Sequence, residues 1–317
     1  MTRALIVGHT GQDGRLLWDQ LAARGFSLVG IARQVVRVEG ADWREVILIN
    51  DGAAVWRLLN EFQPQQIYFL AAHHHSSEQP VDDEGLWSSS WRVHVDAFAE
   101  FLRCASRMKE PPRIFYASSS RVFGTAQVSP QDESTPFRPA CVYGLTKVAA
   151  MHVADFFRRE KGVFVSCGIL FNHESALRGR QFVSQRVVDG LVAIKRGKAD
   201  RLTVGSLDAR VDWGYAGDYT RAMQAMLDAA APDDFVVASG TTHSVRDLAD
   251  QAAAVLRLPS DIIVEETARL LKRESQELCG NPAKLMRTTG WKPSVDFPGL
   301  VRVLVEGALE REASEPR

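Results

Sequence analysis

Tyr143 and Lys147 are a tyrosine and a lysine four residues apart, a spacing that could carry chemistry. On a helix, side chains four residues apart lie on one face. The lysine charge favours a lowered pKa for the tyrosine phenol, which could then exchange a proton with a hydroxyl group near neutral pH. The same spacing also occurs by chance on ordinary helix surfaces, so its meaning depends on the rest of the chain.

Three serines at 118–120 lie upstream of this pair and directly follow an apolar stretch at 114–117 that is typical of a strand. A serine hydroxyl delivered from the end of that strand could hold the oxygen that the tyrosine protonates. Such an arrangement suits hydride transfer to or from a carbinol carbon beside a nicotinamide ring.

A glycine-rich turn near the start of the chain indicates where such a cofactor would bind. Residues 4–7 form a short apolar run, the turn Gly8-His-Thr-Gly11-Gln-Asp-Gly14 follows, and a helical pattern runs from residue 16 to 22. Strand, glycine turn and helix in this order form the phosphate-binding start of a Rossmann unit. The alternative is a tight turn without a ligand. We predict dinucleotide contacts at Gly8, Thr10, Gly11, Gln12, Asp13 and Gly14.

The end of the second predicted strand, residues 26–31, helps to choose the cofactor. An acidic residue there would bind the ribose 2′-hydroxyl of NAD. The chain instead has Arg33, and no carboxylate occurs before Glu39. Arg33 could pair with a 2′-phosphate, which favours NADP. The alternative, a solvated arginine in a loop, leaves NAD open.

The remaining pattern predicts an α/β fold: a Rossmann-type doubly wound parallel sheet with a smaller, helix-rich C-terminal substrate domain. We expect the Rossmann domain over residues 1–170, with return segments at about 212–240, and the smaller domain over 171–211 and 241–317. Segment 212–218 is expected to cap a helix at 219–229. Further strands are expected at 46–49, 67–72, 114–117, 163–170 and 235–238, and further helices at 55–62, 88–107 and 182–195.

Composition excludes several classes of protein. The 317 residues are 45% hydrophobic and carry a formal net charge of −1, so no general attraction to nucleic acid or to an anionic membrane is implied. The four cysteines show no paired spacing, which predicts reduced thiols and a cytoplasmic location. The apolar start is too short for a signal peptide or a membrane span. Histidines 73–75 are adjacent and lack partners at ligand spacing, so no metal site is predicted.

Taken together, these motifs resemble the extended short-chain dehydrogenase/reductases that modify nucleotide sugars, and most closely the GDP-mannose 4,6-dehydratase branch. The similarity runs along the whole chain. The segments that carry it are Gly8-His-Thr-Gly-Gln-Asp-Gly14, Leu70-Ala-Ala72, Thr135-Pro-Phe137, Tyr143-x-x-x-Lys147, Phe171-Asn-His-Glu-Ser175, Asp212-Trp-Gly214, Asp218-Tyr219 and Gly290-Trp-Lys-Pro293.

The resemblance implies roles for individual residues. Tyr143 would be the catalytic acid/base, Lys147 its activator and a ribose contact, and Ser119 the hydroxyl that binds the sugar O4. It also implies a homodimer. Further cofactor contacts would be Arg33, Leu70, Ala71, Ala72, His173 and Arg178. The nucleotide-sugar side would comprise Ser119, Ser120, Arg121, Asn172, Glu174, Val183, Arg186 and Arg210.

One departure from the family pattern bears directly on the reaction. The dehydratase motif reads Ser-Thr-Ser-Glu, and its glutamate takes the proton from C5 of the sugar. The corresponding residues here are Ser118-Ser119-Ser120-Arg121. An arginine stays protonated and cannot act as a general base. Losing such a base typically removes about 10²–10⁴ in rate. Other family arginines are replaced by Leu177, Gln185 and Val211.

Three hypotheses follow. The preferred one is an NADP-dependent enzyme (NAD remaining open) that transfers hydride at C4 of a nucleotide sugar, GDP-linked by resemblance, as a 4-keto reductase, an oxidase or an epimerase. The second is a 4,6-dehydratase in which Glu174 or Glu78 replaces the missing base. The third is a non-catalytic nucleotide-sugar-binding subunit, but such a protein would have no need of Tyr143 and Lys147.

Overall fold

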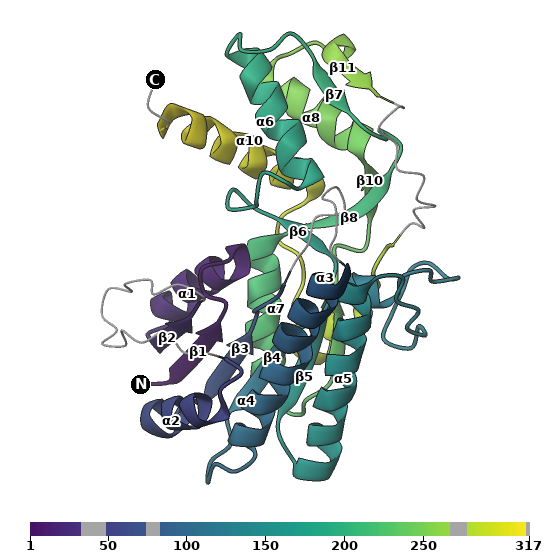
Figure 1. The fold of residues 1–317 in the computed structure, drawn as a ribbon. Coiled ribbons are helices and arrows are strands. Elements are labelled where there is room, and N and C mark those ends of the chain that lie inside the picture. Colours follow the sequence, from purple (N-terminus) through teal and green to yellow (C-terminus); the bar gives the residue numbers. More distant parts are fainter. Residues whose placement is uncertain (33–48, 74–82, 267–277, 315–317) are drawn as a thin grey trace.

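The computed structural model of the protein describes residues 1–32, 49–73, 83–266 and 278–314 (Figure 1). The predicted residues Arg33, Glu39 and Glu78 therefore lie outside the described residues, as do most of the expected strand at 46–49 and two of the three adjacent histidines. Ile49, the last residue of that expected strand, lies in a turn.

Six parallel strands form the central sheet in the order β2-β1-β3-β4-β5-β9. Each strand is a short, mostly apolar run, as expected where both faces of a parallel sheet are covered. The chain moves outward from β1 to β2 and then resumes on the other side with β3, so a topological switch point lies between β1 and β3. The strands are β1 (Arg3–Val7), β2 (Ser27–Ile31), β3 (Gln66–Phe69), β4 (Arg113–Ala117), β5 (Val165–Leu170) and β9 (Asp234–Val237).

Helices cover both faces of this sheet, which confirms the predicted doubly wound α/β class (Figure 1). Alternate residues of each strand face opposite sides, so Leu5 and Val7 pack into one buried cluster and Ala4 and Ile6 into another. The first cluster is covered by α2 (Gly52–Phe62), α4 (Ala97–Ala105) and α5 (Val142–Lys161). The second is covered by α1 (Gln12–Ala23), α7 (Ala216–Asp228) and α9 (Ala283–Thr289).

The helix predicted over 88–107 is interrupted in the middle. It begins earlier, as α3 (Asp83–Trp91), widens into a π-helical turn η1 (Arg92–Asp96), and continues as α4. In η1 the amide of Ala97 reaches back five residues to the carbonyl of Arg92. Single π-helical turns of this kind occur frequently at functional sites.

A separate hydrophobic cluster lies beyond the carboxyl ends of the sheet strands (Figure 1). A three-stranded sheet, β10-β8-β6, and a two-stranded sheet, β11-β7, contribute to this part of the molecule. Its strands are β6 (Asn172–Glu174), β7 (Leu202–Val204), β8 (Arg210–Tyr215), β10 (Thr242–Ser244) and β11 (Ile263–Glu265). Its helices are α6 (Val183–Lys195), α8 (Val245–Leu256) and α10 (Phe297–Ser314), and a short 3-10 turn, η3 (Ser260–Ile262), follows α8. A second 3-10 turn, η2 (Ser120–Val122), follows β4 of the large sheet.

The expectation that segment 212–218 caps the following helix is wrong. Residues 212–215 belong to β8, and α7 already begins at residue 216. The carboxylate of Asp212 instead accepts hydrogen bonds from the amides of Ser239, Gly240 and Gly280 at 2.9, 3.2 and 3.0 Å. Asp212 therefore ties β8 to two loops far along the chain.

Asp218 explains why the segment around Trp291 matters to the fold. Its carboxylate accepts from the amides of Ser294 and Val295, and its carbonyl accepts from the Trp291 indole at 2.8 Å. These bonds hold the loop between α9 and α10 against the first turn of α7. The two motifs are therefore joined in space, and both serve the scaffold.

No helix among the described residues has the length and apolar character needed to cross a membrane. The domain boundaries drawn from the sequence remain a prediction.

Candidate active site

Ser119 and Tyr143 meet at the carboxyl edge of the sheet. Ser119 follows β4 and caps η2, its hydroxyl accepting from the amide of Arg121 at 3.3 Å. Tyr143 is the second residue of α5, and its phenol lies close enough to the Ser119 hydroxyl for that hydroxyl to favour its ionisation. Both side chains are half-buried, so a ligand could reach them. The fold thus brings a serine and a tyrosine hydroxyl to one point.

Lys147 lies one helical turn further on and is almost fully buried, with 1% of its surface exposed. Its ammonium nitrogen donates to the carbonyl of Ala117 at 2.7 Å and lies 5.6 Å from the centre of the Tyr143 ring. Burial lowers the pKa of Lys147 to about 7. This side chain therefore exchanges its proton in the physiological range while remaining fixed to the end of β4.

The expectation that Lys147 lowers the phenol pKa is wrong. Burial of the phenol dominates and raises the pKa of Tyr143 to about 12. The charge of Arg178 and the hydrogen bond from Ser119 oppose this rise, whereas the carboxylate of Asp13 adds to it. A phenol with this pKa is protonated at neutral pH and is ready to donate its proton.

The glycine turn has the geometry of an anion site. Gly8 has a φ of 98°, and a Cβ on it would lie 2.9 Å from the amide nitrogen of Ala71. A Cβ on Gly14 would lie 2.4 Å from the carbonyl oxygen of Gly8, so the start of α1 packs directly on the turn. Gly11 caps α1 without a side-chain bond, which leaves the first amides of the helix for a ligand. These residues fit the diphosphate of a dinucleotide, and Leu70, Ala71 and Ala72 follow β3 beside them.

A charged pair connects this turn to β6. The His173 Nδ1 lies 2.7 Å from the carbonyl of Phe171, which can only accept, and its Nε2 lies 3.0 Å from an Asp13 carboxylate oxygen. Both ring nitrogens must therefore carry protons if Asp13 is ionised. Burial alone would lower the pKa of His173, but the charge and hydrogen bond of Asp13 outweigh it and raise that pKa. Burial likewise opposes ionisation of Asp13, yet His173 lowers the Asp13 pKa.

Gln12 completes the connection. Its amide nitrogen donates to the His173 carbonyl at 3.1 Å, and its amide oxygen accepts from the Ser175 hydroxyl at 2.9 Å. The first turn of α1 is therefore held by three side-chain contacts to the segment that begins at β6.

Glu174 and Arg178 form an ion pair under the site. Their Nε to Oε2 distance is 3.1 Å, and the same oxygen accepts from the hydroxyl of Ser184 at 2.7 Å. The Glu174 side chain is only 2% exposed, and burial raises its pKa. A carboxylate held by a cation and a hydroxyl is poorly placed to take a proton from a substrate, which disfavours Glu174 as a replacement base.

The other predicted residues are dispersed around this centre. Ser120 is buried, whereas Thr10, Arg121 and Asn172 are exposed. Val183 and Arg186 occupy the first turn of α6 and are half-buried. Arg210 uses its guanidinium to donate to the carbonyl of Thr242 at 2.8 Å, across β8 and β10.

The sequence does not single out His94, although the structure places it against α5. Its ring is fully buried and lies edge-on to the Tyr143 ring, with the centroids 5.1 Å apart. The only sequence signal is a histidine inside an otherwise apolar helical pattern, and such a histidine is more often a core residue than a functional one.

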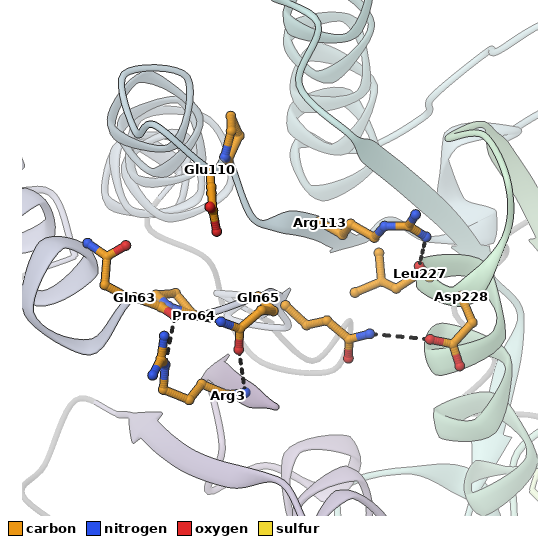
Figure 2. A pocket seen from close by; sticks show the side chains of 10 residues that line it. Arg3, Gln63, Pro64, Gln65, Glu110, Arg113, Leu227 and Asp228 are labelled. Carbon is orange, nitrogen blue, oxygen red and sulfur yellow. Dashed lines mark hydrogen bonds between the residues drawn. The ribbon is translucent and has the colours of Figure 1, made fainter. Parts of the chain in front are cut away.

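A cavity of about 450 Å³ lies at the opposite, amino-terminal edge of the sheet (Figure 2). Arg113 on its wall donates to the carbonyl of Leu227 (Figure 2). Arg113 also donates to the carbonyl of Ala229, and Gln66 donates to Asp228. Because the protein already uses these polar groups, we assign no ligand to the cavity. Within the described ranges, no three His, Cys, Asp or Glu side chains gather as a metal ion would require.

The pair of His173 and Asp13 predicts a pH-dependent stability. A raised pKa means that the contribution of His173 is fully present below its ordinary value of 6.5 and is lost as the pH rises through the raised value. A lowered pKa means that the contribution of Asp13 is present above 3.8 and is lost as the pH falls through the lowered value. His173→Gln should therefore cost about 1.5–3 kcal/mol between these two ordinary values, and less at alkaline pH.

Thermal unfolding of both proteins across the pH range measures this difference. His152→Gln, a change to an exposed histidine on α5, is the matched control and should alter stability little. A cost of His173→Gln that does not vary with pH would contradict the charged pair.

Comparisons with known proteins agree with this arrangement. A family model described as GDP-mannose 4,6 dehydratase matches residues 5–304. The GDP-mannose 4,6 dehydratase 2 of Arabidopsis thaliana is 32% identical over 327 aligned residues, covering 97% of this chain and 87% of the relative. The human GDP-mannose 4,6 dehydratase is 31% identical, covering 99% of this chain and 93% of the relative.

Solved structures share the fold at lower identity. RMD from Pseudomonas aeruginosa, complexed with NADPH, superposes with a TM-score of 0.83 at 21% identity and covers 98% of this chain and 100% of that one. The UDP-glucose 4-epimerase of Thermotoga maritima, with UDP-glucose, has a TM-score of 0.83 at 17% identity, covering 99% of this chain and 100% of that one. The family resemblance seen in the sequence is thereby confirmed: the chain belongs to the GDP-mannose 4,6-dehydratase family of extended short-chain dehydrogenase/reductase enzymes.

Proposed function

We propose that this enzyme transfers hydride at C4 of a GDP-linked sugar, as a 4-keto reductase, an oxidase or an epimerase. One observation carries the proposal: Tyr143 stands beside Ser119 and the buried Lys147. The family resemblance implies, in addition, that Arg121 takes the position of the dehydratase glutamate. Proton transfer at C4 needs only the first three residues. Proton removal from C5 needs a base that Arg121 cannot be.

The proposed cofactor is NADP, with NAD as the alternative. The glycine turn, the open first turn of α1 and the loop at 70–72 would hold it, and Arg33 would choose between the two forms. RMD of the same fold is complexed with NADPH, and the Thermus thermophilus UDP-glucose 4-epimerase with NAD. When bound, a nicotinamide supplies or accepts the hydride.

The chain's own residues account for the accompanying proton. In the reductive direction, Tyr143 donates its phenolic proton to the sugar O4, and the Ser119 hydroxyl holds that oxygen. Lys147 is fixed to the Ala117 carbonyl, so its ammonium stays within 5.6 Å of the Tyr143 ring centre and can stabilise the phenolate that forms. With a pKa of about 12, Tyr143 is protonated at neutral pH, so the proton for O4 is present before reaction begins.

Dehydration is the second candidate, because the named relatives at 31–32% identity are GDP-mannose 4,6 dehydratases. It would require a carboxylate other than the one at position 121. Glu174 is held by Arg178 and Ser184. A non-catalytic sugar-binding role is a third and weaker candidate, since it leaves the arrangement of Tyr143 and Lys147 without a purpose.

Product masses distinguish these candidates. The purified protein is incubated with GDP-mannose and either NADP or NAD, and separately with a GDP-4-keto-6-deoxy sugar and NADPH. We expect no loss of water from GDP-mannose, and consumption of NADPH with the 4-keto sugar. Loss of one water from GDP-mannose would identify a dehydratase and overturn the proposal.

Arg121→Glu is the informative companion variant, because it restores a carboxylate at that position. Some 4-keto-6-deoxy product should then form if Arg121 alone prevents dehydration. Arg121→Gln, which removes the charge without adding a base, is the matched control and should form none.

Tyr143→Phe tests the proton donor directly. The change removes one hydroxyl and keeps the ring, so we expect kcat to fall by about 10²–10⁴ while cofactor affinity changes little. Steady-state rates and cofactor fluorescence titrations measure the two quantities. Retained turnover would exclude Tyr143 as the acid/base.

We also propose that the protein is a homodimer, which the family resemblance implies. Leu145 and Phe156 are 38% and 47% exposed on α5, and eleven residues apart they lie on one side of that helix. Trp87 on the neighbouring α3 is 47% exposed. A second copy of the chain would cover these apolar side chains. The cytoplasmic location remains a prediction from the cysteine pattern.

Phe156→Glu should weaken this dimer at least about tenfold, because a carboxylate would be buried at the contact. Light scattering over a dilution series measures the mass. Val255→Glu on α8 is the matched control, since Val255 is 41% exposed and belongs to another helix. A wild-type protein that stays monomeric at all concentrations would contradict the dimer.

A further inference from the structure

The side chain of His94, in the π-helical turn η1, contacts three residues outside that turn. Its Nε2 lies 2.9 Å from the amide nitrogen of His73, its Nδ1 lies 2.8 Å from the Thr146 hydroxyl, and its ring abuts that of Tyr143. Its surface is fully buried. These contacts define what the ring can do.

The hydrogen bonds determine the tautomer. The His73 amide can only donate, so Nε2 of His94 must present a lone pair. The single ring proton of the neutral imidazole is then on Nδ1 and is donated to the Thr146 hydroxyl. That hydroxyl in turn donates to a carbonyl of the preceding turn of α5, with those of Val142 and Tyr143 both 3.0 Å away. The chain of donors thus runs in one direction, from the His73 backbone into the first turn of the catalytic helix.

The two ends of this series of hydrogen bonds lie in the two regions that a hydride transfer must align, the loop beside the glycine turn and the start of α5. His73 directly follows residues 70–72, and Ala71 of that segment abuts Gly8 of the glycine turn. Thr146 and Tyr143 belong to the first turns of α5, and the T-shaped ring contact restricts where the phenol can point. The π-helical turn brings one imidazole between them.

The same turn also contacts the environment of Lys147. The Tyr116 hydroxyl donates to the His94 carbonyl at 3.2 Å, and the Lys147 nitrogen lies 4.7 Å from the centre of the Tyr116 ring. The backbone of residue 94 is therefore fixed from a third direction, which leaves the ring little freedom to rotate.

We propose that His94 is a positioning residue that holds the loop after β3 in register with the ring of Tyr143, through a neutral imidazole protonated on Nδ1. The proposed role rests on the proposed function only for its effect on kcat. The tautomer of His94 and its bond to the His73 amide do not depend on which reaction the protein catalyses. Protonation of Nε2 would break the bond to His73, so the positively charged ring is incompatible with this arrangement.

Two substitutions separate the two halves of the role. His94→Gln can keep an acceptor near the place of Nε2 but removes the ring against Tyr143. His94→Phe keeps the ring but leaves the His73 amide without that acceptor. We expect His94→Phe to weaken NADPH binding about tenfold with kcat at saturation little changed, because the loss of one hydrogen bond of this kind has roughly that effect. His94→Gln should retain NADPH affinity within about threefold and lower kcat.

The ring nitrogens and the amide are measured directly. Nitrogen-15 spectra of histidine-labelled protein, assigned by the signal missing in His94→Gln, should show His94 protonated on Nδ1. Exchange of the His73 amide with deuterium should speed up in His94→Phe and be restored in His94→Gln. An Nε2-protonated ring, or equal exchange in all three proteins, would overturn the proposal.

The kinetic outcomes decide the rest. If both variants lose affinity, kcat and thermal stability together, His94 is a core residue without a positioning role. If the wild-type protein turns over no sugar, the proposed function fails, while the ring spectra, amide exchange and NADPH affinities still decide the role of His94.

Discussion

Burial of the Lys147 ammonium at the end of β4 is the constraint on which the rest of the site depends. Removing this charge from water is unfavourable, and the structure provides the Ala117 carbonyl as its hydrogen-bond acceptor. That single bond locks the first turns of α5 to β4. Tyr143 is consequently held beside Ser119, because Tyr143 lies one helical turn before Lys147 and Ser119 lies two residues after Ala117.

The same low-polarity surroundings set the proton chemistry. They raise the pKa of Tyr143 and lower that of Lys147, so the neutral forms of both groups are favoured. Arg178 opposes the first effect from a distance in sequence, and Arg178 is itself fixed by Glu174. The residue that tunes the phenol thus belongs to the segment following β6, and that segment also contacts the glycine turn through His173. The glycine turn and the surroundings of the Tyr143 phenol are therefore both fixed by the segment that begins at β6.

Much of the fold could be predicted from the sequence because its signals are local. A strand buried on both faces must be a short apolar run, and a turn packed against Ala71 must have glycine at position 8. The segment at 212–218 shows the limit: it is expected from the sequence to cap a helix at 219–229, but residues 212–215 form a strand, and the carboxylate of Asp212 binds amides at the remote positions 239, 240 and 280. Contacts with residues distant in the sequence, and not local helix capping, determine what Asp212 does.

The site was predictable to a smaller degree, for the same reason. Tyr143 and Lys147 share a helix, so their spacing is visible in the sequence. The effect of Arg178 on Tyr143 and the contact of His94 with His73 depend on how separate elements are placed. The π-helical turn adds a further difficulty, because the extra residue in the turn rotates the following side chains about the helix axis. The helical repeat of 3.6 residues then no longer identifies which side chain faces α5.

The family resemblance puts Arg121 at the position of the dehydratase glutamate, and the backbone and the side chain of this residue have different surroundings. Its amide donates to Ser119, and a Cβ at Gly144 would lie 2.5 Å from its carbonyl oxygen, so the backbone at 121 is part of the frame that holds Ser119 against α5. The exposed side chain is not part of that frame. A glutamate can therefore be exchanged for an arginine without disturbing the hydroxyl pair. In the proposed function, hydride transfer at C4 depends on this frame and elimination depends on a carboxylate at this position, so an arginine there would remove the second reaction and leave the first available.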